Sequence, residues 1–430
     1  MISNKLISDL TCKLIAENII CSESPNAVLY DMSRYDRQLT ALLDAFGGAS
    51  LNALAIKANP IKTILTHAAK MGFGAECASI GELLIAKKSG FISAGIVFDS
   101  PTKTKEEIIY ALREGIMLNI DNMQELYRIE TILEESKIPI SNTIGLRINP
   151  GLSLSDFPQL FTEEDKATIT GLRSSKFGLL LDQARVTLTE STRYRDIITG
   201  LHLHVGSQKC PLEMLICGIR KVVDFAMELN DEYGFSISTI NIGGGLSVRY
   251  KNTDDAVGFG QFAQLLRNEV PCLFDFRIVT EFGRSLHANS GWIVTKVEYT
   301  KTVEDNHNRN HRIALVQVGA DLLLRSSYLN WYHDIIVLDN RGIIKNKNYE
   351  VQSIAGPLCF SGDFIARNRE LPRIESGDWI VIKDAGAYTF CMWSHYNSRT
   401  FPPIYGYDAG LNLSILKAGE TPVDCASFWE

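Results

Sequence analysis

Between residues 50 and 285, short apolar runs alternate with longer amphipathic stretches. In stretches such as KEEIIYALREG and MQELYRIETILEES, apolar residues recur three and four positions apart, which predicts helices with one buried face. The apolar runs are bounded by turn residues, a pattern typical of buried parallel strands. Strands are predicted at 52–58, 72–79, 95–100, 117–122, 143–150, 198–207, 239–245 and 277–284. Eight alternations of strand and helix predict an α/β fold, a (β/α)8 TIM-like barrel.

The pattern changes after about residue 290. Segments such as IVTKVEYTKTVED, RIALVQVG and WIVIKDAG are rich in β-forming residues and show little helical periodicity, which predicts an antiparallel domain. We therefore expect a barrel at 30–290 and a sandwich- or barrel-like C-terminal β-domain at 291–430 that includes part of 1–29. The polar stretch 152–170 is long for a loop, and loops of this length are usually functional or mobile.

Composition and charge exclude several classes of function. The net charge of −7 gives no indication of a nucleic-acid or anionic-membrane partner. No run of about eighteen apolar residues occurs, so we expect a cytoplasmic protein. Nine scattered cysteines without a CxxC pair argue against a disulfide framework and a structural zinc site. The eight histidines show no ligand spacing, and His202 and His204 share a strand face without a third partner, so no metal site is predicted.

Lys57 is the first candidate catalytic residue. It lies in LNALAIKANP, residues 51–60, at the end of the first predicted strand. A lysine buried there would lose hydration, its pKa would fall, and the neutral amine could attack an aldehyde and hold it as a Schiff base. Alternatively, the side chain reaches out of the strand end to water. From this segment alone both interpretations are open.

Polar residues collect where the other predicted barrel strands end, which is where TIM barrels place their active sites. These residues are Glu76, Arg147, Asn149, His204, Ser207, Gly243, Gly244, Gly245, Glu281 and Arg284. The three glycines would let backbone N–H groups approach an anion closely, although a tight turn also explains them. Arg284 and Ser207 on the neighbouring strands favour a phosphate site.

A carboxylate such as Glu281 beside a pyridine nitrogen keeps the ring protonated, and a protonated pyridinium accepts electrons. The alternative for Glu281 is a salt bridge with Arg284 at the barrel rim. His204 could lie flat against the same ring, or be a hydrogen-bonded core histidine. A Schiff-base lysine, a phosphate site and a carboxylate for a ring nitrogen together indicate pyridoxal 5′-phosphate.

Over nearly its whole length the chain resembles the fold-type III PLP-dependent decarboxylases, the group of diaminopimelate and ornithine decarboxylases. The resemblance, nearest to diaminopimelate decarboxylases, is carried by AIKAN around Lys57, ECAS at 76–79, HVGSQ at 204–208, GGG at 243–245, EFGR at 281–284, GPLCFSGD at 356–363 and GAYTF at 386–390. It implies an alanine-racemase-like barrel followed by a β-domain. It also implies a homodimer with active sites shared between subunits.

The resemblance also implies residue roles. Lys57 would hold the cofactor, His204 would stack on its ring, and Glu281 would pair with the ring nitrogen. Glu76, Arg147 and Gly243 would belong to the same cofactor site. Phosphate contacts would come from Ser207, Gly244, Gly245, Arg284 and Tyr388. Cys359 and Asp363 would reach across from the other subunit, with Cys359 returning a proton after CO₂ leaves; without the resemblance, Cys359 reads as an inert buried thiol.

The chain departs from the family pattern at its expected substrate contacts. Diaminopimelate decarboxylases usually read CESGD, and the glutamate position here is Phe360. Their RPxxY motif is replaced by RSSYL, so Arg325 remains but the tyrosine position is Leu329. Arg325 could bind a distal carboxylate or form an ordinary ion pair. We expect Arg284, Arg325, Phe360, Asp363 and Tyr388 to line the substrate site.

These departures favour a decarboxylase for a modified or conjugated amino acid rather than for meso-diaminopimelate. Three other readings within the family are a true diaminopimelate decarboxylase, a basic amino-acid decarboxylase that uses Asp363, and a racemase. From a different class, the chain could be a non-catalytic PLP-binding or regulatory homologue. Such a homologue would be expected to lack Lys57 or Cys359, and both are present.

Overall fold

The predicted barrel forms, and its ring of strands is closed. In this computed structural model, which describes residues 2–157, 168–190, 192–304 and 310–430, eight parallel strands pair in sequence, and the pairings β5–β6 and β10–β2 complete the ring. The strands are β2 (Leu51–Ala55), β3 (Gly74–Cys77), β4 (Ile96–Phe98), β5 (Met117–Ile120), β6 (Ile144–Asn149), β8 (Gly200–His202), β9 (Thr239–Asn241) and β10 (Arg277–Thr280). A short β7 (Leu179–Leu180) pairs with β6. The (β/α)8 prediction is confirmed.

Several strands end earlier than predicted, so polar residues such as Lys57 and Glu281 lie just beyond them. Lys57 lies in a 3₁₀ turn (Ile56–Ala58) that follows β2, instead of in the strand. At the end of β9, the Asn241 side chain accepts the N–H of Gly243 at 2.9 Å, which turns the chain out of the ladder. The N–H of Glu281 then donates to the carbonyl of Gly243 at 2.7 Å. These local bonds replace the strand pairing that the apolar pattern predicted.

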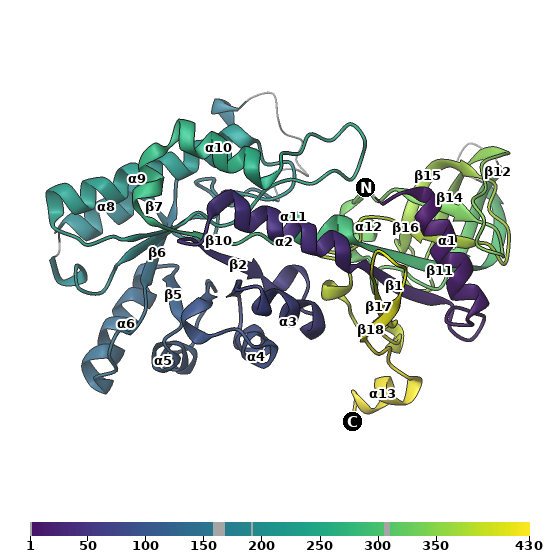
Figure 1. Cartoon of the computed structure of the whole chain (residues 1–430), viewed down its shortest axis with the longest axis horizontal. Helices are drawn as coiled ribbons and strands as arrows, with labels where there is room; N and C mark the ends of the chain where they lie inside the picture. Colours follow the sequence, from purple (N-terminus) through teal and green to yellow (C-terminus); the bar gives the residue numbers. More distant parts are fainter. Residues whose placement is uncertain (1, 158–167, 191, 305–309) are drawn as a thin grey trace. The chain divides into compact units, whose positions relative to one another are not determined.

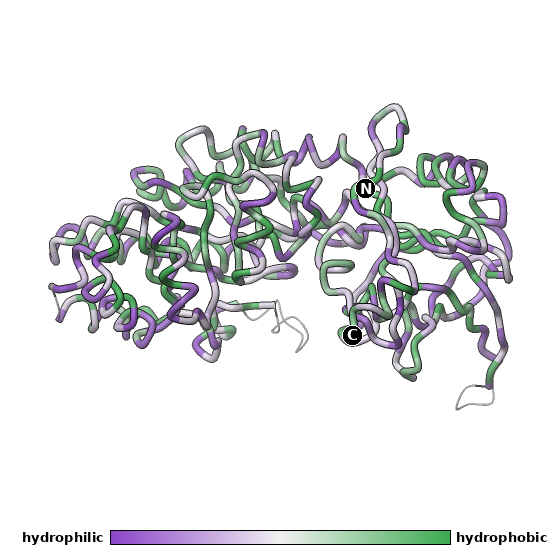
Figure 2. Tube along the Cα trace, turned by 90° about the horizontal axis from the view of Figure 1, so that it is seen from below, coloured by the Kyte–Doolittle hydropathy of each residue, from purple (hydrophilic) through white to green (hydrophobic). Residues whose placement is uncertain are grey.

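Helices follow the strands and lie outside the ring (Figure 1). Their ends are set by capping residues: α5 begins with a capping box between Thr104 and Glu107 and ends at Gly115, whose φ is +66°. Figure 2 shows hydrophobic and hydrophilic residues alternating along the helical turns of this part of the chain. The helices are α2 (Met32–Phe46), α3 (Lys62–Lys70), α4 (Ile80–Ser89), α5 (Lys105–Glu114), α6 (Met123–Ser136), α8 (Leu181–Glu190), α9 (Leu212–Tyr233) and α10 (Phe259–Glu269).

The chain divides into two compact units. The barrel unit comprises Gln38–Val248 and Asp255–Ser285, and the β unit comprises Met1–Arg37, Arg249–Asp254 and Leu286–Glu430. Among the described residues no helix is both long enough and apolar enough to cross a bilayer. Part of the predicted long loop, residues 158–167, lies outside the described residues.

The β unit is built on one mixed, mostly antiparallel sheet. Its strand order is β15-β14-β12-β11-β1-β17-β18, with β16 joining β11 to β13, and only the β1–β17 and β12–β14 pairs are parallel. The strands are β1 (Asn26–Asp31), β11 (Gly291–Glu304), β12 (Asn310–Val316), β13 (Ile335–Leu338), β14 (Tyr349–Ala355), β15 (Phe364–Pro372), β16 (Trp379–Ile382), β17 (Ile404–Tyr407) and β18 (Leu413–Lys417). Helices of this part are α1 (Asn4–Ala16), α11 (Arg284–His287), α12 (Leu324–Leu329) and α13 (Pro422–Ser427).

N-terminal residues help to form the core of the β unit. Leu10 and Leu14 of α1 are fully buried against Trp292 and Leu338. Trp292 donates its indole N–H to the hydroxyl of Tyr407 at 3.2 Å, so this buried polar group is satisfied. The antiparallel sheet predicted from the C-terminal sequence therefore packs against a helix from the start of the chain.

Asp363 fixes the turn that carries the CFSGD motif. Its carboxylate is buried and accepts the backbone N–H groups of Ala320 at 2.6 Å and Leu358 at 2.8 Å. Burial raises the pKa of Asp363, while these two backbone bonds oppose the rise. The carboxylate thus holds the segment 356–363 against the loop that precedes α12.

Replacing Asp363 with Ala should destabilise the β unit. Two buried N–H groups would lose their acceptor, so we expect the free energy of unfolding to fall by about 2–4 kcal/mol. Urea unfolding monitored by circular dichroism measures this change. Glu370→Ala, at an exposed position of β15, is the matched control and should have little effect. Equal stability of the two variants would contradict the proposed anchoring role.

Candidate active site

The carboxyl-terminal edge of the barrel gathers a dense set of ionisable side chains. Lys57 follows β2, Glu76 lies in β3, Arg147 in β6, and Glu281 directly follows β10. Except for Lys57, all of these side chains are buried. Buried charges lose the stabilisation that water gives them, so these side chains need opposite charges and hydrogen-bond partners from within the same group.

Lys57 and Glu76 form an ion pair at the edge of this set. The ammonium Nζ lies 2.6 Å from both carboxylate oxygens of Glu76. The Lys57 side chain is 41% exposed whereas that of Glu76 is fully buried, so of the two open interpretations of this segment the one in which the lysine reaches water holds. The short turn after β2 carries Lys57 out of the strand and away from the buried positions of its neighbours.

Schiff-base chemistry needs a neutral amine on Lys57, and Glu76 is the neighbouring group that could accept its proton. Burial, together with repulsion from Glu281 and Asp99, raises the pKa of Glu76 to about 8, although attraction to Lys57 opposes the rise. A carboxylate with a raised pKa is a suitable acceptor for the proton of a neighbouring amine. Glu76 is therefore a candidate acceptor for the proton of Lys57.

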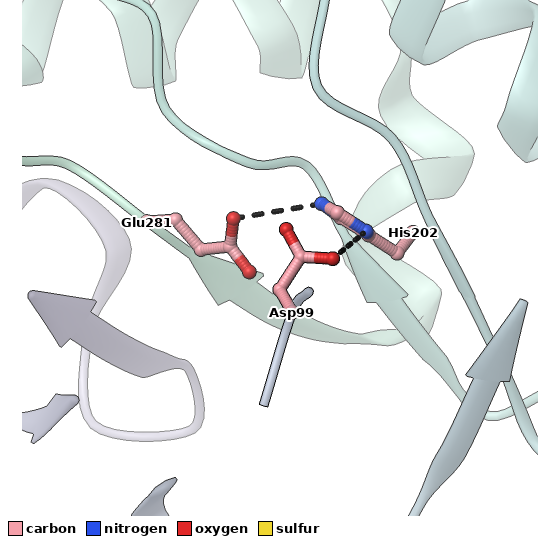
Figure 3. Close-up of side chains that lie close together, drawn as sticks. All are labelled: Asp99, His202 and Glu281. Atoms are coloured by element: carbon pink, nitrogen blue, oxygen red, sulfur yellow. Dashed lines mark ion pairs between the residues drawn. The ribbon is translucent and has the colours of Figure 1, made fainter. Parts of the chain in front are cut away.

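Asp99, His202 and Glu281 form a second group, shown in Figure 3. The Nδ1 of His202 is 3.4 Å from Asp99 and its Nε2 is 3.5 Å from Glu281. All three side chains are buried. The other oxygen of Asp99 lies 3.4 Å from the guanidinium of Arg147. The Glu281 carboxylate also accepts a 2.6 Å hydrogen bond from the side-chain amide of Asn241.

Both carboxylates of this group are held in the ionised form. Burial alone would raise the pKa of Asp99, but Arg147 and His202 outweigh it and hold the pKa well below its usual range. For Glu281 the penalty of burial is likewise outweighed, chiefly by His202, and the pKa is lowered. An ionised Glu281 is the form that would keep a pyridine nitrogen protonated.

His204 and the triple glycine meet after β8 and β9. The N–H of Gly244 donates to the Nδ1 of His204 at 3.2 Å, so this nitrogen acts as an acceptor. Burial, with repulsion from Arg147 and Lys57, lowers the pKa of His204 to about 3, and the ring is neutral at ordinary pH. A neutral, partly buried ring fixed by one nitrogen is suited to lie against a flat ligand.

Glycines are required at 243–245, because other backbone segments lie too close for a Cβ and because two of the three have positive φ. A Cβ on Gly244 would lie 2.4 Å from the carbonyl oxygen of Glu281. Gly243 and Gly245 have φ values of +65° and +108°, which side-chain-bearing residues rarely adopt. The glycine loop therefore has both its conformation and its neighbours fixed, as a preformed anion site needs.

Arg284 and Ser207 complete the anion-binding set. The Nε and one terminal nitrogen of Arg284 each lie 3.4 Å from the hydroxyl of Ser207. The next residue, Gln208, donates to the carbonyl of Val248 at 2.6 Å and accepts its N–H at 2.9 Å. These two hydrogen bonds fix the loop after β8 to the segment that follows the glycines. A guanidinium, a hydroxyl and a glycine-rich backbone are typical phosphate ligands.

The remaining predicted site residues belong to the β unit. Cys359 is exposed, and its N–H donates to the side chain of Asn397 at 2.8 Å. The burial of this thiol, expected without the family resemblance, is therefore wrong. Asp363 is buried with both oxygens bound to backbone, which argues against a direct contact with substrate.

Arg325 and Phe360 each pack against aromatic rings in the β unit. The guanidinium of Arg325 lies over the ring of Tyr388 at 4.8 Å and over that of Trp331 at 5.1 Å. Phe360 stacks on Tyr328, with ring centroids 5.1 Å apart and planes 11° from parallel. The two family departures thus lie close together, because Tyr328 precedes Leu329 on α12.

Sequence reasoning missed Asp99 and Asn241, and it left His202 without a third partner. Asp99 directly follows an apolar strand and could have been selected by the rule that identified Glu281. The ligand-type atoms of His202, Asp99 and Glu281 lie within 4.8 Å of one another, so His202 has the further partners that the sequence did not indicate, although His204 is not among them. Arg147 and Asn241 already occupy one oxygen of each carboxylate.

The residues present fit pyridoxal 5′-phosphate. Lys57 offers an amine for the aldehyde, and Glu281 an ionised carboxylate for the ring nitrogen. His204 offers a neutral ring face. Ser207, Arg284 and the glycine loop offer donors for the phosphate.

Comparisons with known proteins agree with this fit. Residues 32–288 match the family model described as the pyridoxal-binding domain of pyridoxal-dependent decarboxylases. Diaminopimelate decarboxylase of Helicobacter pylori is 33% identical over 377 residues, which is 86% of this chain and 87% of that protein. The enzyme of the same name from Aquifex aeolicus is 31% identical over 373 residues, covering 86% of this chain and 84% of that protein.

Solved structures give the same result over almost the whole chain. The crystal structure of the Helicobacter pylori diaminopimelate decarboxylase complexed with L-lysine has a TM-score of 0.84 at 30% identity, covering 96% of this chain and 99% of that one. The lysine/ornithine decarboxylase of Vibrio vulnificus, at 21% identity and a TM-score of 0.72 over 90% of this chain and 95% of that one, shares the fold.

Gly244→Ala should distort the site. Its Cβ would meet the backbone of Glu281 at 2.4 Å, and backbone cannot move aside as a side chain can. We expect pyridoxal phosphate affinity to fall at least about tenfold and the free energy of unfolding by about 2 kcal/mol. Fluorescence titration and urea unfolding measure the two effects. Gly260→Ala is the control, because a Cβ there meets nothing within 4 Å. Equal affinities in both variants would show that the close approach is unimportant.

Proposed function

The chain belongs to the pyridoxal-dependent amino-acid decarboxylases, in the diaminopimelate decarboxylase group, and we propose that its own substrate differs from meso-diaminopimelate at the distal end. It would remove the α-carboxylate of a modified or conjugated amino acid. The observation that carries this proposal is the stacked pair of Phe360 and Tyr328.

The barrel residues would bind the cofactor in distinct ways. Lys57 would hold the aldehyde, His204 would lie against the ring, and Glu281 would pair with the ring nitrogen. The phosphate would be held by Ser207, Arg284 and the glycines 243–245. When bound, pyridoxal phosphate supplies a protonated ring that accepts the electrons released as CO₂ leaves.

The protonation states of the ionisable residues in the site support decarboxylation with pyridoxal phosphate. Glu76, with a pKa raised to about 8 mainly by burial, can take the proton of Lys57 and return it when the lysine must leave. The pKa of Glu281 is lowered in spite of its burial, so this carboxylate stays ionised. His204 stays neutral, so it adds no positive charge against the face of the ring.

Cys359 would return a proton to Cα after CO₂ has left. Its exposure makes the thiol available, and the bond from its N–H to Asn397 fixes the backbone that carries it. We expect it to act across the interface of a cytoplasmic homodimer with shared active sites. Asp363 would act indirectly, by holding the turn that presents Cys359 and Phe360.

Phe360 and Leu329 would shape the distal end of the substrate site. The glutamate and tyrosine of the usual motifs could receive a distal ammonium, whereas phenylalanine and leucine cannot. An unpaired ammonium against these side chains would cost about 1–3 kcal/mol or more. An apolar or amide-containing substituent would instead pack on the aromatic pair, and Arg325 could meet a carboxylate.

The second candidate is meso-diaminopimelate decarboxylase itself. It is favoured by the names of the relatives with 31–33% identity and by the retained Arg325. A non-catalytic homologue is the least supported of the candidate functions, because the amine of Lys57 is paired with Glu76 and the thiol of Cys359 is exposed.

Release of CO₂ by the purified, cofactor-loaded protein tests the proposal. We expect kcat/KM for meso-diaminopimelate to be at least about 100-fold below that of the Helicobacter pylori enzyme measured in parallel, a difference of about 2.7 kcal/mol. Lysine, ornithine and side-chain-acylated diamino acids complete the panel, and an acylated substrate should be preferred. Lys57→Ala is the inactive control. Comparable turnover of meso-diaminopimelate would establish the second candidate instead.

Restoring the family contacts should restore the family substrate. The double variant Phe360→Glu with Leu329→Tyr should raise kcat/KM for meso-diaminopimelate at least about tenfold, because the distal ammonium would regain charged and hydroxyl partners. Phe360→Gln with Leu329→Phe has similar shape without the charge and serves as the control. A folded double variant with no gain over this control would show that the two positions do not select the substrate.

A further inference from the structure

His202 has a position that the proposed roles do not explain. It ends β8 and is fully buried, with Asp99 on one side and Glu281 on the other (Figure 3). Nδ1 lies 3.4 Å from Asp99, and Nε2 lies 3.5 Å from Glu281. Neither contact has full hydrogen-bond geometry, and the described residues offer these ring nitrogens no other hydrogen-bond partner.

The chemistry of imidazole restricts what such a ring can be. A neutral imidazole carries one N–H, so it can donate toward only one of the two carboxylates and must turn a lone pair toward the other. An imidazolium carries two N–H groups and attracts both. Two ionised carboxylates without a cation between them would repel each other in a medium that screens charge poorly.

Of the groups around these two carboxylates, His202 is the one that lies between them and can carry a positive charge. The remaining oxygens of the two carboxylates are bound to Arg147 and to the uncharged amide of Asn241. Arg147 therefore balances Asp99, and Lys57 balances Glu76. The Glu281 carboxylate lies 3.5 Å from the Nε2 of His202, a group that can carry positive charge.

We propose that His202 is a positioning residue for Glu281, which it keeps ionised and in place as an imidazolium shared with Asp99. The inference rests on the proposed role of Glu281 at the ring nitrogen of the cofactor. His202 itself need not touch cofactor or substrate. Through Glu281 it would set how firmly the ring nitrogen holds its proton, and so how well the ring accepts electrons.

Nitrogen NMR of the cofactor-loaded protein with ¹⁵N-labelled histidine tests the protonation directly. His202 should show two protonated ring nitrogens, and its signal is assigned by its absence in His202→Gln. In Asp99→Asn, with one carboxylate neutralised, the doubly protonated ring should be less populated under the same conditions. A single protonated nitrogen in the wild type would overturn the proposal, as would a stoichiometric divalent metal found by elemental analysis.

The consequence for the cofactor is tested with ¹⁵N-labelled pyridoxal phosphate. In His202→Gln the protein should still load with cofactor, but the ring-nitrogen signal should move from the pyridinium toward the neutral position. The kcat should fall about 10- to 100-fold while KM changes less than about threefold. His67→Gln, in α3, is the matched control and should retain the wild-type signal and rate. His202→Lys, which restores a cation, should return the signal toward the wild-type position.

These outcomes separate this inference from the proposed function. A wild-type protein that shows no pyridinium signal when loaded would contradict the role of Glu281 itself. A wild-type pyridinium signal that persists in folded His202→Gln would overturn only the role of His202. If His202→Lys fails to fold, the comparison of His202→Gln with His67→Gln still decides.

Discussion

The candidate site depends on the compensation of carboxylates that are buried together at one edge of a closed barrel. Glu76, Asp99 and Glu281 are buried, and each keeps or loses its proton according to the charged groups beside it. Lys57 pairs with Glu76, and Arg147 with Asp99. The result is one carboxylate with a high proton affinity beside the reactive amine and another held ionised for the cofactor. Similar groups thus perform opposite tasks because their environments differ.

Much of this arrangement could be predicted from the sequence, because strands and helices are determined by the local pattern of apolar and polar residues. The alternation of apolar runs and amphipathic stretches predicts the barrel, and the barrel rule places Lys57, Glu281 and Arg284 at one edge. The pattern could not locate the strand ends, since those depend on single hydrogen bonds such as that from Gly243 to Asn241. It also left the exposure of Lys57 open, because that exposure is set by a turn of three residues. The neighbours of His202 come from strands distant in the chain, so no spacing could reveal them.

The β unit shows why a substitution is better understood with its neighbours than alone. Phe360 read in isolation is only a lost glutamate. In the structure its ring stacks on Tyr328, one residue before the position where the family tyrosine is also absent. Asp363 holds the backbone of the same turn, so Cys359 is presented in a fixed frame. The two departures therefore form one altered surface rather than two independent losses.

The paired bonds between Gln208 and Val248 join the loop that carries Ser207 to the segment that follows the glycines. An anion that binds one of these loops therefore also stabilises the position of the other. The free energy of cofactor binding is then transferred to the folding equilibrium of the whole barrel edge by mass action. In a cell, the supply of pyridoxal phosphate would regulate not only how much of this protein is active but also how long each molecule escapes proteolysis.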